Sequence, residues 1–183
     1  MFRRFLRVAA LALGLMAFPG DARADITRFG SNDIQTVFFI SKSDGVSRVD
    51  YGIRLTEHCA PVNDEAVFPY WRELGLNPVV LHSLGIFEYV PYGFAEQRLV
   101  HRTLTGGDQM IRLKQVERPI LVVTKKEADG RCSAQARARI GGVEGAILVS
   151  VHAMMSGAMS VDYIDIHGRN PQTGADITER VRK

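Results

Sequence analysis

The sequence predicts an all-β fold of the mainly antiparallel kind, a sandwich or barrel of roughly eight to ten short strands with at most one or two short helices. Three observations lead to this class. Short segments that alternate apolar and polar residues recur along the chain, and turn-forming residues such as Gly, Asp and Asn separate them. A third is that the alanine-rich segment 131–140 itself alternates with period two, a pattern that a helix cannot produce.

The clearest single element is a β-hairpin at residues 37–55. Residues 37–40 are apolar, Asp44-Gly45 is a turn pair, and residues 48–55 alternate. We expect one face of the second arm to be buried and the other to be wet, and the uniformly apolar first arm to be central. The buried face would carry Val49, Tyr51, Ile53 and Leu55, and the wet face Arg48, Asp50, Gly52 and Arg54.

The middle of the chain gives weaker signals. Residues 56–65 are loop-like, and Pro69 and Pro78 interrupt the two apolar segments that follow. Proline cannot donate to a sheet ladder, so these segments should be short strands or lie at sheet edges. Residues 82–89 are the best candidate for a helix, although Gly85 weakens it.

The second half of the chain again predicts strands joined by tight turns. The expected strands are residues 95–104, 109–116, 120–126, 131–140, 146–154, 159–167 and 177–181. In segment 131–140, small residues share one face with Cys132 and Ile140, so a bulky partner should pack there. We expect that partner to be the aromatic first arm, residues 37–40.

The N-terminus has the pattern of a cleaved signal peptide at residues 1–24. Arg3, Arg4 and Arg7 precede an apolar run, and Ala22-Arg23-Ala24 supplies the small residues of a cleavage site. The apolar run, residues 8–18, is too short to cross a hydrocarbon core of about 30 Å. We therefore expect cleavage after Ala24, a single β-rich domain at residues 25–183, no transmembrane span, and a periplasmic or secreted location.

Removal of this segment abolishes the basic character of the chain. Of 23 Lys and Arg residues four lie in the first 24, and of 20 Asp and Glu residues one does, so 19 of each remain. Nucleic-acid binding depends on phosphate neutralisation by an excess of basic residues. The sequence therefore argues against a nucleic-acid partner.

The two cysteines, Cys59 and Cys132, are predicted to form a disulfide, because an even cysteine count in an exported chain favours pairing. Closing a loop of about 74 residues would stabilise the fold by roughly 4 kcal/mol. Two buried free thiols are one alternative. A nucleophilic cysteine is the other, prompted by His58, although neighbours in an extended chain point to opposite faces.

Several motifs match a known family in chain order and span nearly all of the predicted mature domain. They are residues 37–40 with Lys42 and Ser43, 49–51, 69–71, Glu88 with 91–93, and 161–164 through His167 and Gly168 to 173–174. On these motifs the chain resembles the bacterial domain-of-unknown-function family numbered 4833. The resemblance implies a small exported module with no established activity, and it carries no catalytic residue onto this chain.

Metal and hydrolase motifs give little support to catalysis. The five histidines show no zinc-binding spacing, and no serine lies in a Gly-x-Ser-x-Gly elbow. Asp165 and His167 share one face of a predicted strand and are weak candidates for a metal site or an acid–base pair. More often such a pair is the wet end of a strand. We assign no catalytic residue and expect no cofactor.

Aromatic residues with polar neighbours give the best candidate binding site. Tyr70, Trp71 and Tyr92, with Arg72 and Glu88 nearby, could line a ligand pocket or contact a partner. The alternative is ordinary core packing. The predicted function is a non-catalytic binding or structural module of the cell envelope, with a small apolar ligand or an envelope protein as partner. The alternative is a hydrolase-like or metal-dependent enzyme whose site is assembled from several strands.

Overall fold

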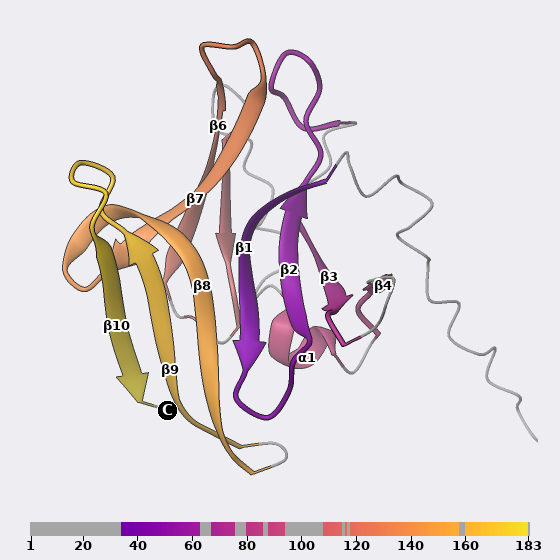
Figure 1. Cartoon of the computed structure of the whole chain (residues 1–183), viewed down its shortest axis with the longest axis vertical. Coiled ribbons are helices and arrows are strands. Elements are labelled where there is room, and N and C mark those ends of the chain that lie inside the picture. The colour runs from indigo at the N-terminus through magenta and orange to yellow at the C-terminus, as the bar shows by residue number, and fades with distance from the viewer. Residues whose placement is uncertain are drawn as a thin grey trace, which may run out of the picture.

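The computed structural model describes residues 34–62, 67–75, 80–85, 88–93, 108–114, 116, 118–157 and 160–182. The predicted signal peptide, the strand expected at residues 95–104 and the turn after it lie outside the described residues, apart from Asp108. The all-β prediction is confirmed, since the described residues form one curled sheet of ten strands, almost all antiparallel (Figure 1).

The ten strands are numbered in chain order. They are β1 (Gln35–Lys42), β2 (Arg48–Ile53), β3 (Phe68–Glu73), β4 (Val80–Ser83), β5 (Gln109–Arg112), β6 (Pro119–Lys126), β7 (Cys132–Ile140), β8 (Val143–Gly157), β9 (Ser160–Arg169) and β10 (Asp176–Arg182). One short helix, α1 (Tyr89–Tyr92), lies between β4 and β5. The order in the sheet is β4-β3-β2-β1-β8-β7-β6-β5, and β9 and β10 branch from β8.

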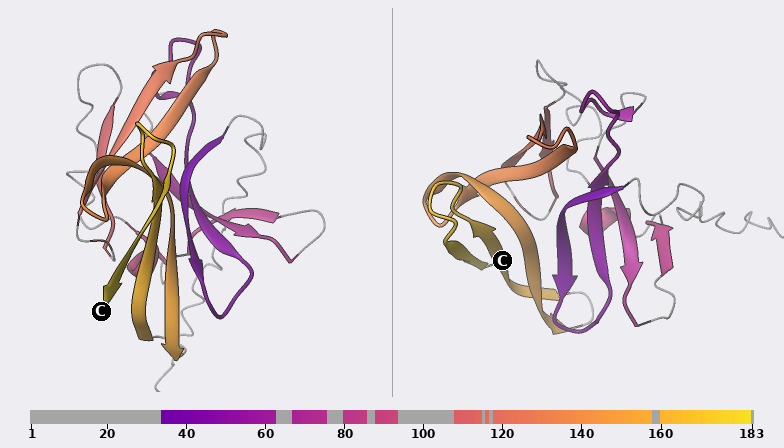
Figure 2. Two further views of the ribbon diagram at one scale, coloured as in Figure 1. Left: turned by 60° about the vertical axis from the view of Figure 1, so that its left-hand side comes forward. Right: turned by 45° about the horizontal axis from the view of Figure 1, so that its top comes forward.

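The long strand β8 is where the sheet branches. Its first half pairs antiparallel with β7, its second half pairs parallel with β1, and β9 pairs along it from Ile147 to Gly157. Strands β7 and β1 therefore follow one another along the edge of β8 opposite β9. Figure 2 shows the result, a sheet that curls so that β1–β4 and β8–β10 form walls at an angle to each other.

The β1–β2 hairpin confirms the strongest sequence prediction. Ser41 pairs with Arg48 and Gln35 with Ile53, with a register shift between Thr36 and Phe38. Strand β1 lies between β2 and β8, so the apolar first arm is central as predicted. Apolar side chains of β1, β2 and β7–β9 fill the inner face of the curl, and they include Phe38, Ile40, Val49, Tyr51, Ile53, Ala136, Ala138, Leu148, Val151, Ile164 and Ile166.

The prediction that one face of β2 is solvent-exposed is wrong at two positions. Asp50 is 0 % exposed, and Gly52 is buried as well. A Cβ on Gly52 would lie 2.5 Å from Ile34 Cγ2 and 2.9 Å from Tyr70 Cε1, so this position needs glycine. The outer face of the sheet is therefore covered by side chains at this point, and a second small core around Tyr70 and Leu81 lies there.

The predicted helix at residues 82–89 is also wrong in its position. His82 and Ser83 belong to β4 and pair with Trp71 and Tyr70 of β3, and the helix begins only at Tyr89. Cross-strand hydrogen bonding to β3 satisfies the backbone of β4, which local helix propensity does not anticipate. Strands β3 and β4 are short, as expected from the presence of Pro69 and Pro78, and β4 lies at the sheet edge.

A disulfide joins Cys59 to Cys132 and confirms the predicted pairing. It ties the loop between β2 and β3 to the start of β7. Next to it, the side-chain amide of Gln35 donates to the Cys132 carbonyl (2.7 Å) and accepts from the Ala134 backbone N–H (3.1 Å). Neither cysteine is a free thiol, so both alternatives, inert thiols and a nucleophilic cysteine, are excluded.

Candidate functional site

A fully buried carboxylate lies on the outer face of the sheet, at Asp50 of β2. Arg48 Nε donates to its Oδ1 at 2.7 Å, and Arg72 Nε donates to its Oδ2 at 2.5 Å. Thr36 Oγ1 adds a longer hydrogen bond to Oδ2, at 3.3 Å. Both oxygens of the carboxylate are therefore bonded to side chains from three strands. We call Asp50, Arg48 and Arg72 the Asp50 cluster.

The strand register explains why these residues meet. Arg48 and Asp50 are two apart on β2 and so point to the same face. Across the β2–β3 ladder, Arg72 pairs with Arg48 and Tyr70 with Asp50. On the other side Phe39 of β1 pairs with Asp50, and the Arg48 guanidinium carbon lies 4.1 Å from the centre of the Phe39 ring.

The electrostatics of the cluster favour the charged form of Arg72. The cluster carries two positive charges and one negative charge, and the Arg48 and Arg72 side chains are 28 % and 27 % exposed. Burial lowers the pKa of Arg72, but the hydrogen bond and charge of Asp50 more than offset this, so its pKa is raised. Burial raises the pKa of Tyr70, and the hydrogen bonds with Thr36 and Arg72 oppose this only in part.

The outer face continues as a row of polar residues toward β10. Ser41 Oγ lies 3.0 Å from His152 Nδ1, and Asp165 pairs with His152 across the β8–β9 ladder. Asp165 accepts two hydrogen bonds from Arg180, at 2.7 and 2.8 Å. The Arg180 guanidinium holds the pKa of the Asp165 carboxyl below its usual range.

The two weak metal candidates each have other partners. Asp165 is bonded to Arg180, and His167 Nδ1 lies 3.1 Å from Thr178 Oγ1. Across the described part of the chain, no group of three or more His, Cys, Asp and Glu side chains is placed to hold a metal ion.

The predicted binding residues divide between the two faces of the sheet. Tyr70 and Arg72 lie on the outer face with Asp50. Arg72 Nη2 donates to the Tyr70 hydroxyl at 3.3 Å. Trp71 lies on the inner face, where its ring meets the Tyr92 ring edge-on at 5.4 Å between centroids. Burial raises the pKa of Tyr92 to about 12.

The inner pair is built into the core beside α1. The Tyr51 hydroxyl donates to the Tyr92 carbonyl at 2.5 Å, and Trp71 packs against the same core. Glu88 accepts a hydrogen bond from the Gly85 N–H at 2.6 Å, just before α1 begins. In the predicted set, then, Trp71 meets Tyr92 and Tyr70 meets Arg72, while Glu88 bonds outside the set.

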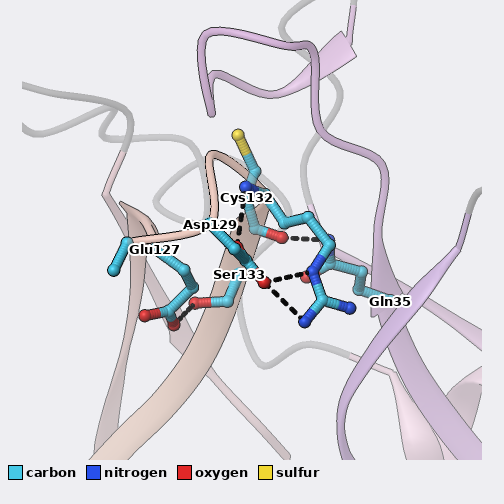
Figure 3. Close-up of a pocket in the computed structure, with 7 residues that line it drawn as sticks. Gln35, Glu127, Asp129, Cys132 and Ser133 are labelled. Carbon is cyan, nitrogen blue, oxygen red and sulfur yellow. Dashed lines mark hydrogen bonds and ion pairs between the residues drawn. The ribbon is translucent and has the colours of Figure 1, made fainter.

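A separate hollow lies at the tip of the β6–β7 hairpin (Figure 3). Its volume is about 690 Å³, and it is lined by Gln35, Glu127, Ala128, Asp129, Arg131, Cys132 and Ser133. Its polar side chains bond to one another: Arg131 Nε donates to Asp129 Oδ2 at 2.7 Å, and Ser133 Oγ donates to Glu127 Oε1 at 2.5 Å. These contacts brace the hairpin beside the disulfide.

Arg48 and Asp50 were not predicted from the sequence to be site residues. Their spacing placed them correctly on one face, but nothing local indicated that the carboxylate is buried. The missing information was the register between β2 and β3, which brings Arg72 beside Arg48.

Comparison with known proteins gives a family and no further relative. No curated protein matches the chain, and no solved structure matches it. Among the residues that the structure describes, no helix has the length and apolarity needed to cross a membrane. The family model for the domain of unknown function DUF4833 matches residues 38–180, most of the chain, and it agrees with the resemblance seen in the sequence motifs. The chain therefore belongs to the DUF4833 family.

Proposed function

We propose that this protein is a non-catalytic binding module of the cell envelope, which contacts its partner through the outer face around Asp50. In this proposal the chain is exported by the signal peptide 1–24, and the mature domain begins at Asp25. The disulfide supports export, because such bonds persist mainly in oxidising compartments.

The observation that carries the proposal is the burial of Asp50 between two partly exposed arginines. Desolvating a carboxylate and its partners costs about as much as their attraction returns, so a buried ion pair is a poor way to stabilise a fold. It is an effective way to hold guanidinium groups at a surface in one orientation. Oriented arginines at a surface are typical of binding sites.

The partner of such a face is polar or charged. The small apolar ligand expected from the sequence depended on Tyr70, Trp71 and Tyr92 lining one surface. Trp71 and Tyr92 pack in the core instead, and Tyr70 is 1 % exposed. The two guanidiniums near Asp50 are partly exposed, as are Ser41 and His152 on the next strands. Thr36 is exposed on the same face, and the Phe39 ring beside Arg48 is partly exposed.

A melting-temperature panel tests the proposal. The oxidised mature domain would be heated with inorganic phosphate, acetate, a neutral disaccharide or a medium-chain fatty acid. We expect at least one compound to raise the Tm of the wild type and of Arg180→Lys, a control on the same face, but not of Arg48→Lys/Arg72→Lys. A ligand that binds only the native state raises Tm by mass action. If no compound raises Tm, or if the double variant responds like the wild type, the proposal is wrong.

The Ser41–His152 contact favours a second candidate, a serine hydrolase. Ser41 would act as nucleophile and His152 as base, with Asp165 opposite His152. Against this, both Asp165 oxygens accept hydrogen bonds from Arg180, and none from His152. A fluorophosphonate probe decides: labelling of the wild type that Ser41→Ala abolishes supports the hydrolase, and no labelling supports the binding module.

A further inference from the structure

We propose that Arg48 and Arg72 together bind a phosphoryl group, so that the ligand of this module is a phosphate or phosphate ester. This inference rests on the proposed binding function and names the chemical class of its ligand.

The donor groups of both arginines are oriented by Asp50. Each arginine uses its Nε to bond a different oxygen of Asp50, which fixes both guanidinium planes relative to one carboxylate. Within the described residues, the Nη groups of Arg48 donate to no protein acceptor. Of the two Nη groups of Arg72, Nη2 donates to the Tyr70 hydroxyl at 3.3 Å. The remaining N–H groups are donors available to a ligand.

Both arginine side chains are already held in place before any ligand binds. The Arg48 guanidinium lies over the Phe39 ring at 4.1 Å, and Asp50 is fully buried beneath both arginines. Arginine side chains normally lose rotamer freedom when they bind a ligand, and that cost opposes binding. Here the ring and the carboxylate have already ordered them, so less free energy is lost when the ligand arrives.

The spacing of the two arginines favours a phosphoryl group as the ligand. Arg48 and Arg72 are direct cross-strand partners, so their Cβ atoms lie about 5 Å apart. A carboxylate offers two acceptor oxygens. A phosphoryl group presents three or more and can accept hydrogen bonds from Nη groups of both arginines at once. The net charge of the cluster, one positive charge after Asp50 is counted, also suits an anion.

The neighbouring strands β1 and β8 add two further polar groups. Ser41 of β1 pairs with Arg48, and its hydroxyl is linked to His152 Nδ1 at 3.0 Å. A phosphoryl oxygen beside Arg48 therefore has a hydroxyl and an imidazole on its other flank. The β8–β10 end of the same face lacks this arrangement, because Arg180 is bonded through Nε and Nη2 to Asp165.

The test is a titration of the oxidised mature domain with inorganic phosphate, followed by NMR of backbone amides and arginine Nε–H groups. We expect saturable shifts at Arg48 and Arg72 and no comparable response to acetate at the same ionic strength. Arg48→Lys and Arg72→Lys keep the charge beside Asp50 but lose the fork. Each should weaken phosphate binding about tenfold, since a hydrogen bond to a charged group contributes roughly that factor. Arg180→Lys is the matched control and should bind phosphate as the wild type does.

Three results would overturn the inference. They are the absence of saturable phosphate shifts, an equal loss of affinity in Arg180→Lys, and acetate binding as tight as phosphate. If a neutral sugar raises the Tm of the wild type but not of Arg48→Lys/Arg72→Lys, while phosphate fails, the binding module stands and only its ligand class is wrong. If Arg48→Lys lowers the Tm strongly, Ser41→Ala, which leaves the Asp50 cluster intact, provides a second variant and should weaken phosphate binding by a smaller factor.

Vesicles distinguish the two sources of a phosphoryl group. Co-sedimentation with phosphatidylcholine vesicles that contain phosphatidylglycerol, lost in Arg48→Lys and absent with pure phosphatidylcholine, would assign a lipid headgroup. Phosphate binding in the titration without co-sedimentation would assign a soluble phosphate.

Discussion

Two aspartates on the same face of this sheet pair with arginines in very different surroundings. Asp50 and Asp165 each accept from an arginine Nε at 2.7 Å. The Asp50 side chain is 0 % exposed and has two arginine partners that are 28 % and 27 % exposed. The Asp165 side chain is 14 % exposed, and its one partner, Arg180, is 56 % exposed.

The difference teaches that hydrogen-bond geometry alone does not give the energetic importance of an ion pair. When an exposed pair is broken, water solvates both groups, and the loss is about 0 to 1 kcal/mol. When a buried pair is broken, the surviving charge keeps its desolvation cost without its partner. The Asp50 cluster should therefore tolerate substitution poorly, and the Asp165 pair should tolerate it well.

The largest expected effect is that of Asp50→Asn. The substitution leaves two arginines facing each other without the carboxylate between them, and we expect a loss of about 3 kcal/mol in the free energy of unfolding. Urea denaturation of the oxidised protein measures it. Asp165→Asn is the matched control. A loss below about 1 kcal/mol for Asp50→Asn would remove the contrast between the two sites.

Ala136→Leu sets the scale for the opposite, apolar face of the sheet. Ala136 is 0 % exposed and belongs to the same core cluster as Phe38, as the pairing of the first arm with the alanine face predicts. Three added carbon atoms cannot be accommodated there without strain, and we expect a loss of about 2 kcal/mol. Ala175→Leu, at an exposed position before β10, is the control and should be nearly neutral. A neutral Ala136→Leu would show that the core has room beside Phe38.

Local patterns predicted the strands well, because period two is written in consecutive residues. The alanine strand β7 was identified from alternation, and the hairpin at residues 37–55 from an apolar arm, a turn pair and an alternating arm. The helix at residues 82–89 failed because β4 is only four residues long and is specified by its pairing with β3. A strand whose main support is a distant partner has too little local pattern to be recognised.

The candidate site was predicted only in part, for a related reason. Tyr70 and Trp71 were grouped as aromatic residues with Arg72 as a polar neighbour, but consecutive strand residues point to opposite faces. The true neighbours of Arg72 are Arg48 and Asp50, more than 20 positions earlier in the chain, and only the β2–β3 register brings them together. Burial of Asp50 follows from three strands meeting at one point, which a single sequence does not encode locally.

A third carboxylate, Glu179, has a side chain that is 28 % exposed and should show its contribution to stability through pH. It accepts from both terminal nitrogens of Arg118, at 2.8 and 2.7 Å, and from the Gly141 N–H at 2.8 Å. The Arg118 hydrogen bonds lower the pKa of Glu179 to about 2. Because the folded pKa lies below the unfolded one, the stabilisation is complete above about pH 4.5 and is lost as the pH falls toward 2.

Glu179→Gln should therefore cost about 1 kcal/mol or less at pH 7, since both side chains are about a quarter exposed, and nothing at low pH. Urea denaturation between neutral pH and about pH 2 measures the difference between variant and wild type. Glu144→Gln, at a carboxylate that is 77 % exposed, is the control and should leave the pH dependence unchanged. A penalty for Glu179→Gln that persisted at the lowest pH would contradict the ionic origin.

The smallest expected effect, and the sharpest test of the comparison, is the coupling between Asp165 and Arg180. A double-mutant cycle with Asp165→Asn and Arg180→Gln should give only a small interaction energy, and high salt should reduce it, because both groups lie within reach of screening ions. The same cycle with Asp50→Asn and Arg72→Gln should give a larger coupling that salt changes little, because water and ions do not reach the Asp50 carboxylate. Equal couplings with equal salt dependence would mean that burial does not distinguish the two aspartates. In that case the Asp50 cluster would hold its arginines no more firmly than an ordinary surface pair does.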